Sequence, residues 1–234
     1  MNKARISLED YVRQQSLISR RELLQYITSK KVTVNGNVVS DLRKDIHVSD
    51  KVMVNGKQIL NKHRYLYYKV NKPKGMLTTM DDPKGRYCIG DLIKELNLPL
   101  FPVGRLDRDS TGLIILTNDG DFSQRLSHPS YDCNKVYNVS LDKRLTKKDS
   151  ERLLAGIILE DGPVIFKSCL TDEFGAQVTL SEGRNRIVRR SFESLGYTVT
   201  QLKRVSIAAL QLSNLKPGKA KAFTTAELKA FHIK

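Results

Sequence analysis

The first 62 residues carry apolar side chains at a helical spacing twice and at a strand-like spacing twice. Apolar residues at intervals of three and four predict one amphipathic helix near residue 8. A second helix is predicted to begin at the Ser-Arg-Arg-Glu segment 19–22, because this spacing of serine and glutamate forms a capping box. The apolar residues that mark these two helices are Leu8, Tyr11, Val12, Leu23, Leu24 and Ile27.

Two short strand pairs follow in the same part of the chain. Segments 32–39 and 52–59 each place an Asn-Gly pair between short stretches that contain apolar residues. Asn-Gly supplies the positive φ angles of a two-residue type I′ turn, so each segment predicts a tight β-hairpin. Residues 1–62 are therefore expected to form a small helix–hairpin domain, and residues 63–234 a second, larger domain.

Residues 63–234 alternate irregularly between strand-like and helix-like patterns, which predicts an α+β fold with a mixed, mainly antiparallel sheet. The run 113–116 is apolar throughout, as is typical of a buried strand. The other predicted strands lie at 66–70, 136–141, 164–167 and 177–180, with two further candidates at 198–202 and 209–212. The predicted helices lie at 92–96, 123–126, 147–155 and 187–195.

The chain is strongly basic. Forty Lys and Arg against 25 Asp and Glu give a net charge of +15, and both predicted domains carry a surplus of positive charge. Such a surplus attracts phosphate backbones through counterion release, so nucleic acid is the expected partner. No apolar run approaches the roughly 20 residues that cross a bilayer, and no signal segment is evident. We therefore expect a cytoplasmic protein with no membrane partner.

Cysteines and histidines show no pattern of a bound group. The three cysteines are widely spaced and form no Cys-x-x-Cys pair, and the four histidines are equally scattered. A disulfide framework and a metal site are therefore not expected. Glycine-rich nucleotide-binding motifs are also missing, so no cofactor is expected.

Segment 101–120 is the leading candidate for chemistry. Asp107 lies in a polar, glycine-containing turn directly before the apolar run 113–116. Arg105 and Arg108 flank this aspartate and favour its ionised form, which acts as a nucleophile or base rather than as a proton donor. On spacing alone, a capping role for the aspartate is equally compatible.

Five segments, in order, resemble the motifs of the RsuA-type ribosomal RNA pseudouridine synthases. They are Asn-Lys-Pro-Lys-Gly at 71–75, the segment 104–120 that begins Gly-Arg-Leu-Asp, Lys-Val-Tyr at 135–137, the basic segment 182–190, and Leu-Lys-Pro-Gly at 215–218 with Leu228. The pattern from residue 19 to residue 36 is similar to the RNA-binding module of ribosomal protein S-four. Together these similarities cover nearly the whole chain.

The resemblance implies an isomerase that breaks the base–sugar bond of a uridine in ribosomal RNA, turns the uracil and rejoins it through carbon. It implies that Asp107 is the essential carboxylate, that Tyr137 stacks on the target uracil, and that Arg189 pairs with Asp107. Asp107 would attack the anomeric carbon, attack the pyrimidine ring, or remove the sugar 2′-proton. None of these three steps needs a metal or redox cofactor.

RNA contacts are expected from both domains. Arg20 and Arg21 lie at a helix start, where the helix dipole disfavours positive charge, so a use beyond stability is indicated; a solvated face is the alternative. Arg184, Arg186 and Arg190 are expected to meet phosphates, because they are too many to find internal acids. The full set of expected RNA-binding residues is Arg20, Arg21, Lys31, Asn35, Lys72, Arg105, Arg184, Arg186 and Arg190.

The expected function is therefore that of a monomeric ribosomal RNA pseudouridine synthase. The Asp-Arg-Asp-Ser sequence at 107–110 is more similar to the large-subunit branch of the family (the RluB, RluE and RluF types) than to the small-subunit branch. The alternatives are a small-subunit rRNA pseudouridine synthase and a non-catalytic RNA-binding or ribosome-assembly factor with the same fold. A metal-dependent nuclease lacks the acidic cluster that two-metal chemistry needs.

Overall fold

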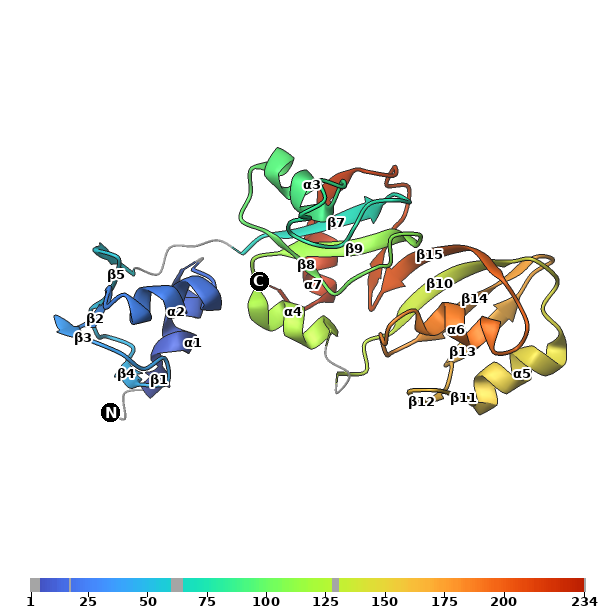
Figure 1. Cartoon of the computed structure of the whole chain (residues 1–234), viewed down its shortest axis with the longest axis horizontal. Helices are drawn as coiled ribbons and strands as arrows, with labels where there is room; N and C mark the ends of the chain where they lie inside the picture. Colours follow the sequence, from blue (N-terminus) through green and yellow to red (C-terminus); the bar gives the residue numbers. More distant parts are fainter. Residues whose placement is uncertain (1–4, 17, 60–64, 128–130, 234) are drawn as a thin grey trace. The chain divides into compact units, whose positions relative to one another are not determined.

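The computed structural model describes residues 5–16, 18–59, 65–127 and 131–233. The chain divides into two compact units, Met1–Tyr65 and Leu66–Lys234 (Figure 1). The domain boundary predicted between residues 62 and 63 falls at 60–64, outside the described residues. Each unit has a hydrophobic core built from its own residues.

The first unit contains two helices and two small sheets. A four-stranded sheet has the order β3-β2-β5-β6, and β1 pairs with β4. The elements are β1 (Arg5–Ser7), α1 (Leu8–Gln15), α2 (Arg20–Thr28), β2 (Val32–Val34), β3 (Asn37–Val38), β4 (Asp45–His47), β5 (Val52–Val54) and β6 (Lys57–Gln58).

The local signals in the first unit are confirmed with one exception. Ser19 Oγ accepts the N–H of Glu22 at 3.2 Å, and the Glu22 carboxylate accepts the N–H of Ser19 at 2.8 Å, which completes the capping box. Both Asn-Gly pairs have positive φ angles, and each joins two paired antiparallel strands. The exception is Leu24, which marks this amphipathic helix in the sequence but is 51% exposed, because the buried face of α2 consists of Leu23 and Ile27.

The second unit is built on one nine-stranded sheet in which every pair is antiparallel except β15 with β9. The main strand order is β13 (Ser168–Thr171), β14 (Gly175–Leu180), β10 (Lys135–Leu141), β15 (Val199–Ile207), β9 (Thr111–Thr117), β7 (Tyr67–Lys72) and β17 (Ala220–Ala222). Strand β8 (Phe101–Val103) also pairs with β9, and β16 (Leu210–Gln211) with β15. The remaining elements are α3 (Ile89–Leu96), α4 (Gly120–Ser127), α5 (Lys147–Ala155), α6 (Ile187–Glu193), α7 (Thr225–Ala230) and the hairpin of β11 (Ile157–Leu159) with β12 (Gly162–Val164).

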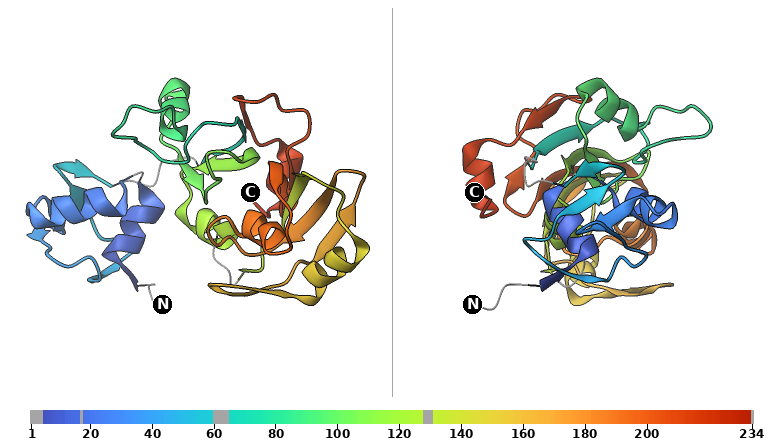
Figure 2. Two further views of the ribbon diagram at one scale, coloured as in Figure 1. Left: turned by 45° about the vertical axis from the view of Figure 1, so that its right-hand side comes forward. Right: turned by 90° about the vertical axis from the view of Figure 1, so that its left-hand side faces the viewer.

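Strand β9 is buried on both faces, as the apolar run 113–116 predicts. Leu113 and Ile115 pack in a cluster with residues of α4, whereas Ile114 and Leu116 pack in a cluster with residues of α3. A third cluster joins α5 and α6 to β10, β14 and β15. Figure 2 shows these helices from two further directions.

The mixed, mainly antiparallel α+β fold expected for this part of the chain is confirmed. The strand predicted at 164–167 is wrong, because β12 ends at Val164. The next residues instead connect α5 to the sheet, with Phe166 N–H bonded to Leu153 O at 3.0 Å and Lys167 N–H bonded to Thr179 O at 2.9 Å.

The parallel contact between β15 and β9 depends on a glycine. Arg204 in β15 pairs with Gly112 in β9. Gly112 has a φ of +102°, and a Cβ atom there would lie 2.2 Å from the carbonyl oxygen of Arg204. Only glycine therefore allows the two strands to meet at this point without displacement. The junction matters because the strongest candidate site lies beside it.

Candidate active site

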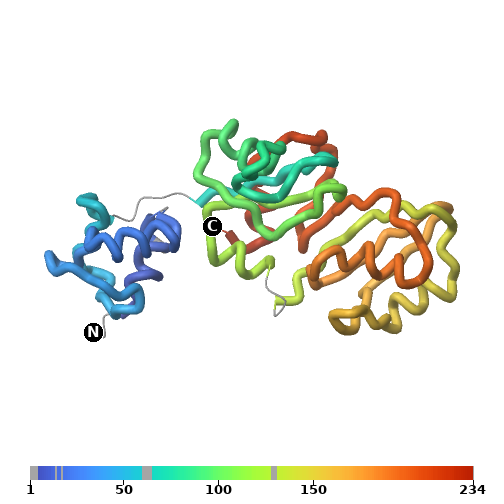
Figure 3. The backbone as a smooth tube through the Cα atoms, in the orientation of Figure 1, coloured from blue at the N-terminus to red at the C-terminus, as the bar shows by residue number. Residues whose placement is uncertain are grey.

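Asp107 lies in a loop whose backbone is fixed on both sides of it. Thr78 Oγ1 donates to Leu106 O at 2.8 Å and accepts the Leu106 N–H at 3.3 Å. After Asp107, a turn forms in which Ser110 N–H donates to Asp107 O at 3.1 Å. Figure 3 traces the backbone of this loop and of the segment that carries Thr78. The carboxylate is therefore held in position through its main chain.

Two basic residues bind the next two carbonyls of the same loop. Arg108 O accepts the N–H of Gly75 at 2.9 Å and the ammonium group of Lys72 at 3.3 Å. Asp109 O accepts a guanidinium N–H of Arg189 at 3.4 Å. Both basic residues thus bind the loop backbone and not the Asp107 carboxylate. The carboxylate has no hydrogen-bond or ion-pair partner among the described residues, so it is available to a ligand.

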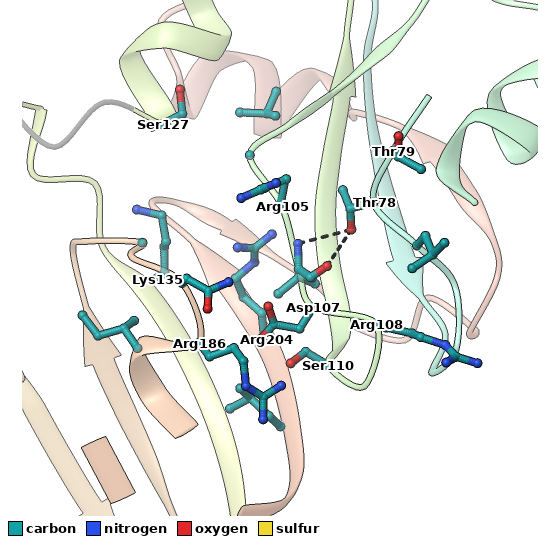
Figure 4. Close-up of a pocket in the computed structure, with 18 of the residues that line it drawn as sticks. Thr78, Thr79, Arg105, Asp107, Arg108, Ser110, Ser127, Lys135, Arg186 and Arg204 are labelled. Carbon is teal, nitrogen blue, oxygen red and sulfur yellow. Dashed lines mark hydrogen bonds between the residues drawn. The ribbon is translucent and has the colours of Figure 1, made fainter. Parts of the chain in front are cut away.

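Asp107 lines a pocket of about 570 Å³, which is within the size range of small-molecule sites. Tyr137 on β10 lines the same pocket, with only 7% of its surface exposed. Figure 4 shows Asp107 with several basic side chains around it. The cationic residues that line the pocket are Arg86, Arg105, Arg108, Lys135, Arg184, Arg186 and Arg204.

Arg189 does not form the expected direct pair with Asp107. Its guanidinium is buried on α6 and donates to Val199 O at 2.8 Å as well as to Asp109 O. Burial lowers the pKa of Arg189, and the charges of Asp107 and Asp109 act in the opposite direction. Arg189 thus lies within electrostatic reach of Asp107, but it contacts the loop backbone rather than the carboxylate.

The expectation that Lys72 binds RNA is wrong for this structure, because none of its surface is exposed. Its ammonium group donates to Pro73 O at 3.0 Å and to Arg108 O at 3.3 Å. Burial lowers the pKa of Lys72 to about 8, while the charges of Asp107 and Asp109 act in the opposite direction. Lys72 therefore supports the Asp107 loop from inside the protein.

The argument that Arg184, Arg186 and Arg190 are too many to find internal acids is also wrong. Arg184 pairs with Asp161 at 2.9 Å and with Glu182 at 2.6 Å. Arg190 pairs with the second oxygen of Asp161 at 2.7 Å. Of the three, only Arg186 lacks a hydrogen-bond or ion-pair partner in the described part of the chain, and it lines the pocket. Asp161, which lies 23 residues before Arg184 in the sequence, is the acid that Arg184 and Arg190 share.

In the first unit, the four candidate RNA-binding residues differ in how far they are already engaged. Arg20 pairs with Glu9 at 3.2 Å. Asn35 uses both ends of its amide inside the unit, donating to Asp50 and accepting the N–H of Lys51, each at 2.9 Å. The two candidates that are exposed and without a side-chain partner among the described residues are Arg21 and Lys31.

The pocket residues that the sequence did not identify as site residues include Thr78, Lys135 and Arg204, although Lys135 lies in a recognised motif. Thr78 fixes the Asp107 loop, and Lys135 and Arg204 line the pocket. Arg204 carried a usable signal, because it follows Leu202 by two positions in a strand and therefore shares its buried face. A charge at such a position is uncommon and indicates a special use. Thr78 carried no such signal.

The cysteines are free, with Cys88 and Cys133 buried. The described residues contain no group of three or more His, Cys, Asp or Glu side chains placed to hold a metal ion. Within the described segments, no helix combines the length and the apolar composition that crossing a membrane requires.

Comparisons with known proteins agree on one family. A family model described as RNA pseudouridylate synthase matches residues 66–194. The ribosomal large subunit pseudouridine synthase B of Bacillus subtilis (strain 168) is 37% identical over 229 residues, which cover 95% of this chain and 93% of that protein. A protein of the same name from Pseudomonas aeruginosa is 38% identical over 209 residues, covering 84% of this chain and 53% of the relative.

A solved structure supports the same comparison at the level of the fold. A crystal structure of a pseudouridylate synthase aligns with 96% of this chain and 99% of its own, with a TM-score of 0.70 and 28% sequence identity. The alignment therefore extends over both units.

Proposed function

This chain belongs to the RNA pseudouridylate synthase family, and from that premise we propose that it converts a uridine of large-subunit ribosomal RNA to pseudouridine. As an RNA pseudouridine synthase it is an isomerase. The large-subunit substrate is inferred from the names of the Bacillus and Pseudomonas relatives. A ribosomal RNA substrate also favours a cytoplasmic enzyme. We further propose that the enzyme is a monomer, because the action of one Asp107 on one uridine requires no second subunit.

The observation that supports the proposal best is the Asp107 carboxylate itself. It faces a pocket without an internal partner, while the backbone beside it is fixed through Leu106 and Arg108. A preorganised group of this kind reacts without first giving up contacts of its own. A non-catalytic RNA-binding protein would gain little from the same carboxylate, because it repels phosphates.

We assign different roles to the three residues implied by the family motifs. Asp107 acts on the ribose or the base of the target nucleotide, by one of the three steps described above. Tyr137 forms one wall of the pocket, where its ring stacks on the uracil. Arg189 is a positioning residue in this proposal, because it holds the Asp109 carbonyl and attracts the Asp107 charge from a distance.

The target uridine must leave its stack to reach Asp107, which costs a few kcal/mol. Basic side chains that line the pocket, including Arg105 and Arg186, would compensate for this cost by binding the RNA backbone. We propose that the first unit is a ribosomal-protein-S-four-like RNA-binding domain. Its exposed Arg21 and Lys31 would raise the local concentration of the enzyme at the rRNA.

The test is to incubate the purified protein with unmodified large-subunit and small-subunit rRNA and to map pseudouridine in both. We expect one or a few modified positions in the large-subunit rRNA, and none when Asp107→Asn is used. Modification of small-subunit rRNA alone would overturn the substrate assignment. Tight binding of rRNA without any product would favour the non-catalytic alternative.

A further inference from the structure

A half-buried lysine and a buried arginine on neighbouring strands share the pocket of Asp107. Lys135 begins β10, and its ammonium group donates to Cys133 O at 3.1 Å and to Ser181 O at 2.9 Å. Arg204 in β15 pairs with Tyr137 across the sheet, and its Nε donates to Leu113 O at 2.7 Å. Both side chains line the pocket (Figure 4).

Neither cation is neutralised by the protein. No ion pair involves Lys135 or Arg204 among the described residues, and Nη2 of Arg204 is buried without a hydrogen-bond partner. Two carboxylates attract Lys135 from a distance, but Asp132 already pairs with Lys167, and Glu182 pairs with Arg184. The internal partners of Lys135 and Arg204 are therefore carbonyl oxygens only.

The two charges also oppose each other. Burial lowers the pKa of Lys135, and the positive charge of Arg204 acts in the same direction. Buried charges are normally paired, because taking an unpaired charge out of water is costly. Two neighbouring like charges in one pocket, with a donor left unused, indicate that an anionic ligand completes the site.

We propose that Lys135 and Arg204 form a phosphate subsite of the pocket, which binds a backbone phosphodiester of the RNA next to the target uridine. The proposal rests on the proposed function, because Asp107 must act on a nucleotide in the same pocket. A ribose within reach of Asp107 carries phosphodiesters on its 3′ and 5′ oxygens, so the substrate brings the required anion with it.

Phosphate fits these two residues better than the other available acceptors. A guanidinium group offers paired donors that match phosphate oxygens, and a lysine adds a point charge. A uracil carbonyl is neutral and would leave both charges uncompensated. The Asp107 carboxylate lines the same pocket, yet it forms an ion pair with neither residue.

The first test measures RNA affinity against salt concentration in an Asp107→Asn background, which prevents turnover. The probe is the rRNA fragment that the parent enzyme modifies. We expect Lys135→Met and Arg204→Met each to weaken binding and to lower the slope of log affinity against log salt by about 1. Lys203→Met is the matched control, because Lys203 is exposed and precedes Arg204 in the strand, on the opposite face.

The phosphate itself is tested by chemical replacement. One phosphodiester beside the target uridine is changed to an uncharged methylphosphonate, first on the 5′ side and then on the 3′ side. One of the two replacements should weaken binding of the parent protein and have no additional effect on Lys135→Met. Additive losses at both positions, or an equal loss of slope in Lys203→Met, would show that the proposal is wrong.

A second readout needs no RNA and separates this proposal from the proposed function. Inorganic phosphate, compared with chloride at equal ionic strength, should raise the Tm of the parent protein and of Lys203→Met more than that of Lys135→Met or Arg204→Met. This result can be obtained even if no rRNA is modified, in which case only the proposed function fails. Equal stabilisation of all four proteins would overturn the subsite.

Discussion

Two pairs of basic residues in the second unit carry the same charge but differ in whether acidic side chains neutralise them. Arg184 and Arg190 share the carboxylate of Asp161, and Arg184 also pairs with Glu182, so their charges are largely balanced inside the protein. Lys135, which is half-buried, and Arg204, which is buried, donate to carbonyl oxygens and have no acid partner among the described residues. The difference shows that positive charge alone does not identify an RNA contact. What distinguishes the groups is whether the fold already supplies the counterion.

The paired group has a structural role of its own. Asp161 lies between β11 and β12, whereas Arg184 and Arg190 flank the start of α6. The ion pairs therefore connect the hairpin to the segment that leads into α6. This segment includes Arg186, which faces the pocket, and the helix carries Arg189, which holds Asp109 O.

The largest effect is expected from disturbing the strand junction that positions the unpaired group. Gly112→Ala would place a Cβ atom 2.2 Å from Arg204 O, in a backbone conformation with a φ of +102°. We expect a loss of about 4 kcal/mol in the free energy of unfolding, from overpacking together with backbone strain. Urea denaturation measures this loss.

Gly104→Ala is the matched control for Gly112→Ala. Gly104 also has a positive φ, of +70°, but no atom lies within 4 Å of an added Cβ. Only the backbone cost of about 1–2 kcal/mol should appear there. Equal losses at the two positions would mean that the close approach at Arg204 is not important.

Lys72 is in a third situation, because it is fully buried. Carbonyl oxygens accept hydrogen bonds from its ammonium group, and the negative charge of Asp107 attracts it. Its pKa of about 8 is below the ordinary lysine value of 10.5 because the side chain is buried. Between these two pH values the unfolded chain binds a proton that the folded chain does not, so stability rises with pH. The full rise attributable to Lys72 is about 3 kcal/mol.

This contribution appears as a difference between two proteins. The free energy of unfolding is measured from pH 7.5 to pH 10.5 for the parent protein and for Lys72→Met. The parent should gain stability relative to the variant as pH rises through this window. Parallel curves would contradict the burial of a charged Lys72.

Local rules predicted the local structure well. The capping box at Ser19, the Asn-Gly hairpins and the buried strand around Ile114 each depend on residues close together in the sequence. The strand predicted at 164–167 failed because long-range bonds from Phe166 to Leu153 decide the path of the chain. Short edge strands such as β17 were missed for the same reason, since only their pairing defines them.

The candidate site shows the same contrast between features that neighbouring residues determine and features that distant contacts determine. The segments around Asp107 and Tyr137 were found from their motifs, and the fold brings both residues to one pocket. The burial of Lys72 and the pairing of Arg190 with Asp161 were not visible, because each depends on contacts between distant segments. Residue type and spacing therefore located the site, while packing decided which cations remain available in it.

A smaller effect tests whether Asp161 acts as the internal counterion. Asp161→Asn removes the carboxylate that Arg184 and Arg190 share. We expect affinity for rRNA to rise about threefold and to depend more steeply on salt, because Arg190 loses its acid partner and becomes available for phosphates, while Arg184 keeps only Glu182. Filter binding at several salt concentrations measures both quantities. Weaker binding with a shallower slope would contradict the comparison.

The smallest effect is expected in the first unit, where one arginine is paired and its neighbour is not. Arg20 pairs with Glu9, whereas Arg21 has no side-chain partner in the described part of the chain. Arg21→Ala should lower the salt slope of rRNA binding by about 1, and Arg20→Ala by less. If the two variants are indistinguishable, the presence of an internal partner does not predict RNA contacts in this unit.

The most direct measurement of the central claim is the single-turnover rate of pseudouridine formation in Asp107→Asn. Asp109→Asn is the matched control, because it changes a carboxylate two residues away in the same loop. We expect Asp107→Asn to bind rRNA and to form no detectable product, while Asp109→Asn stays within about tenfold of the parent, a change of about 1.4 kcal/mol in the barrier. Turnover by Asp107→Asn at the parent rate would contradict the account.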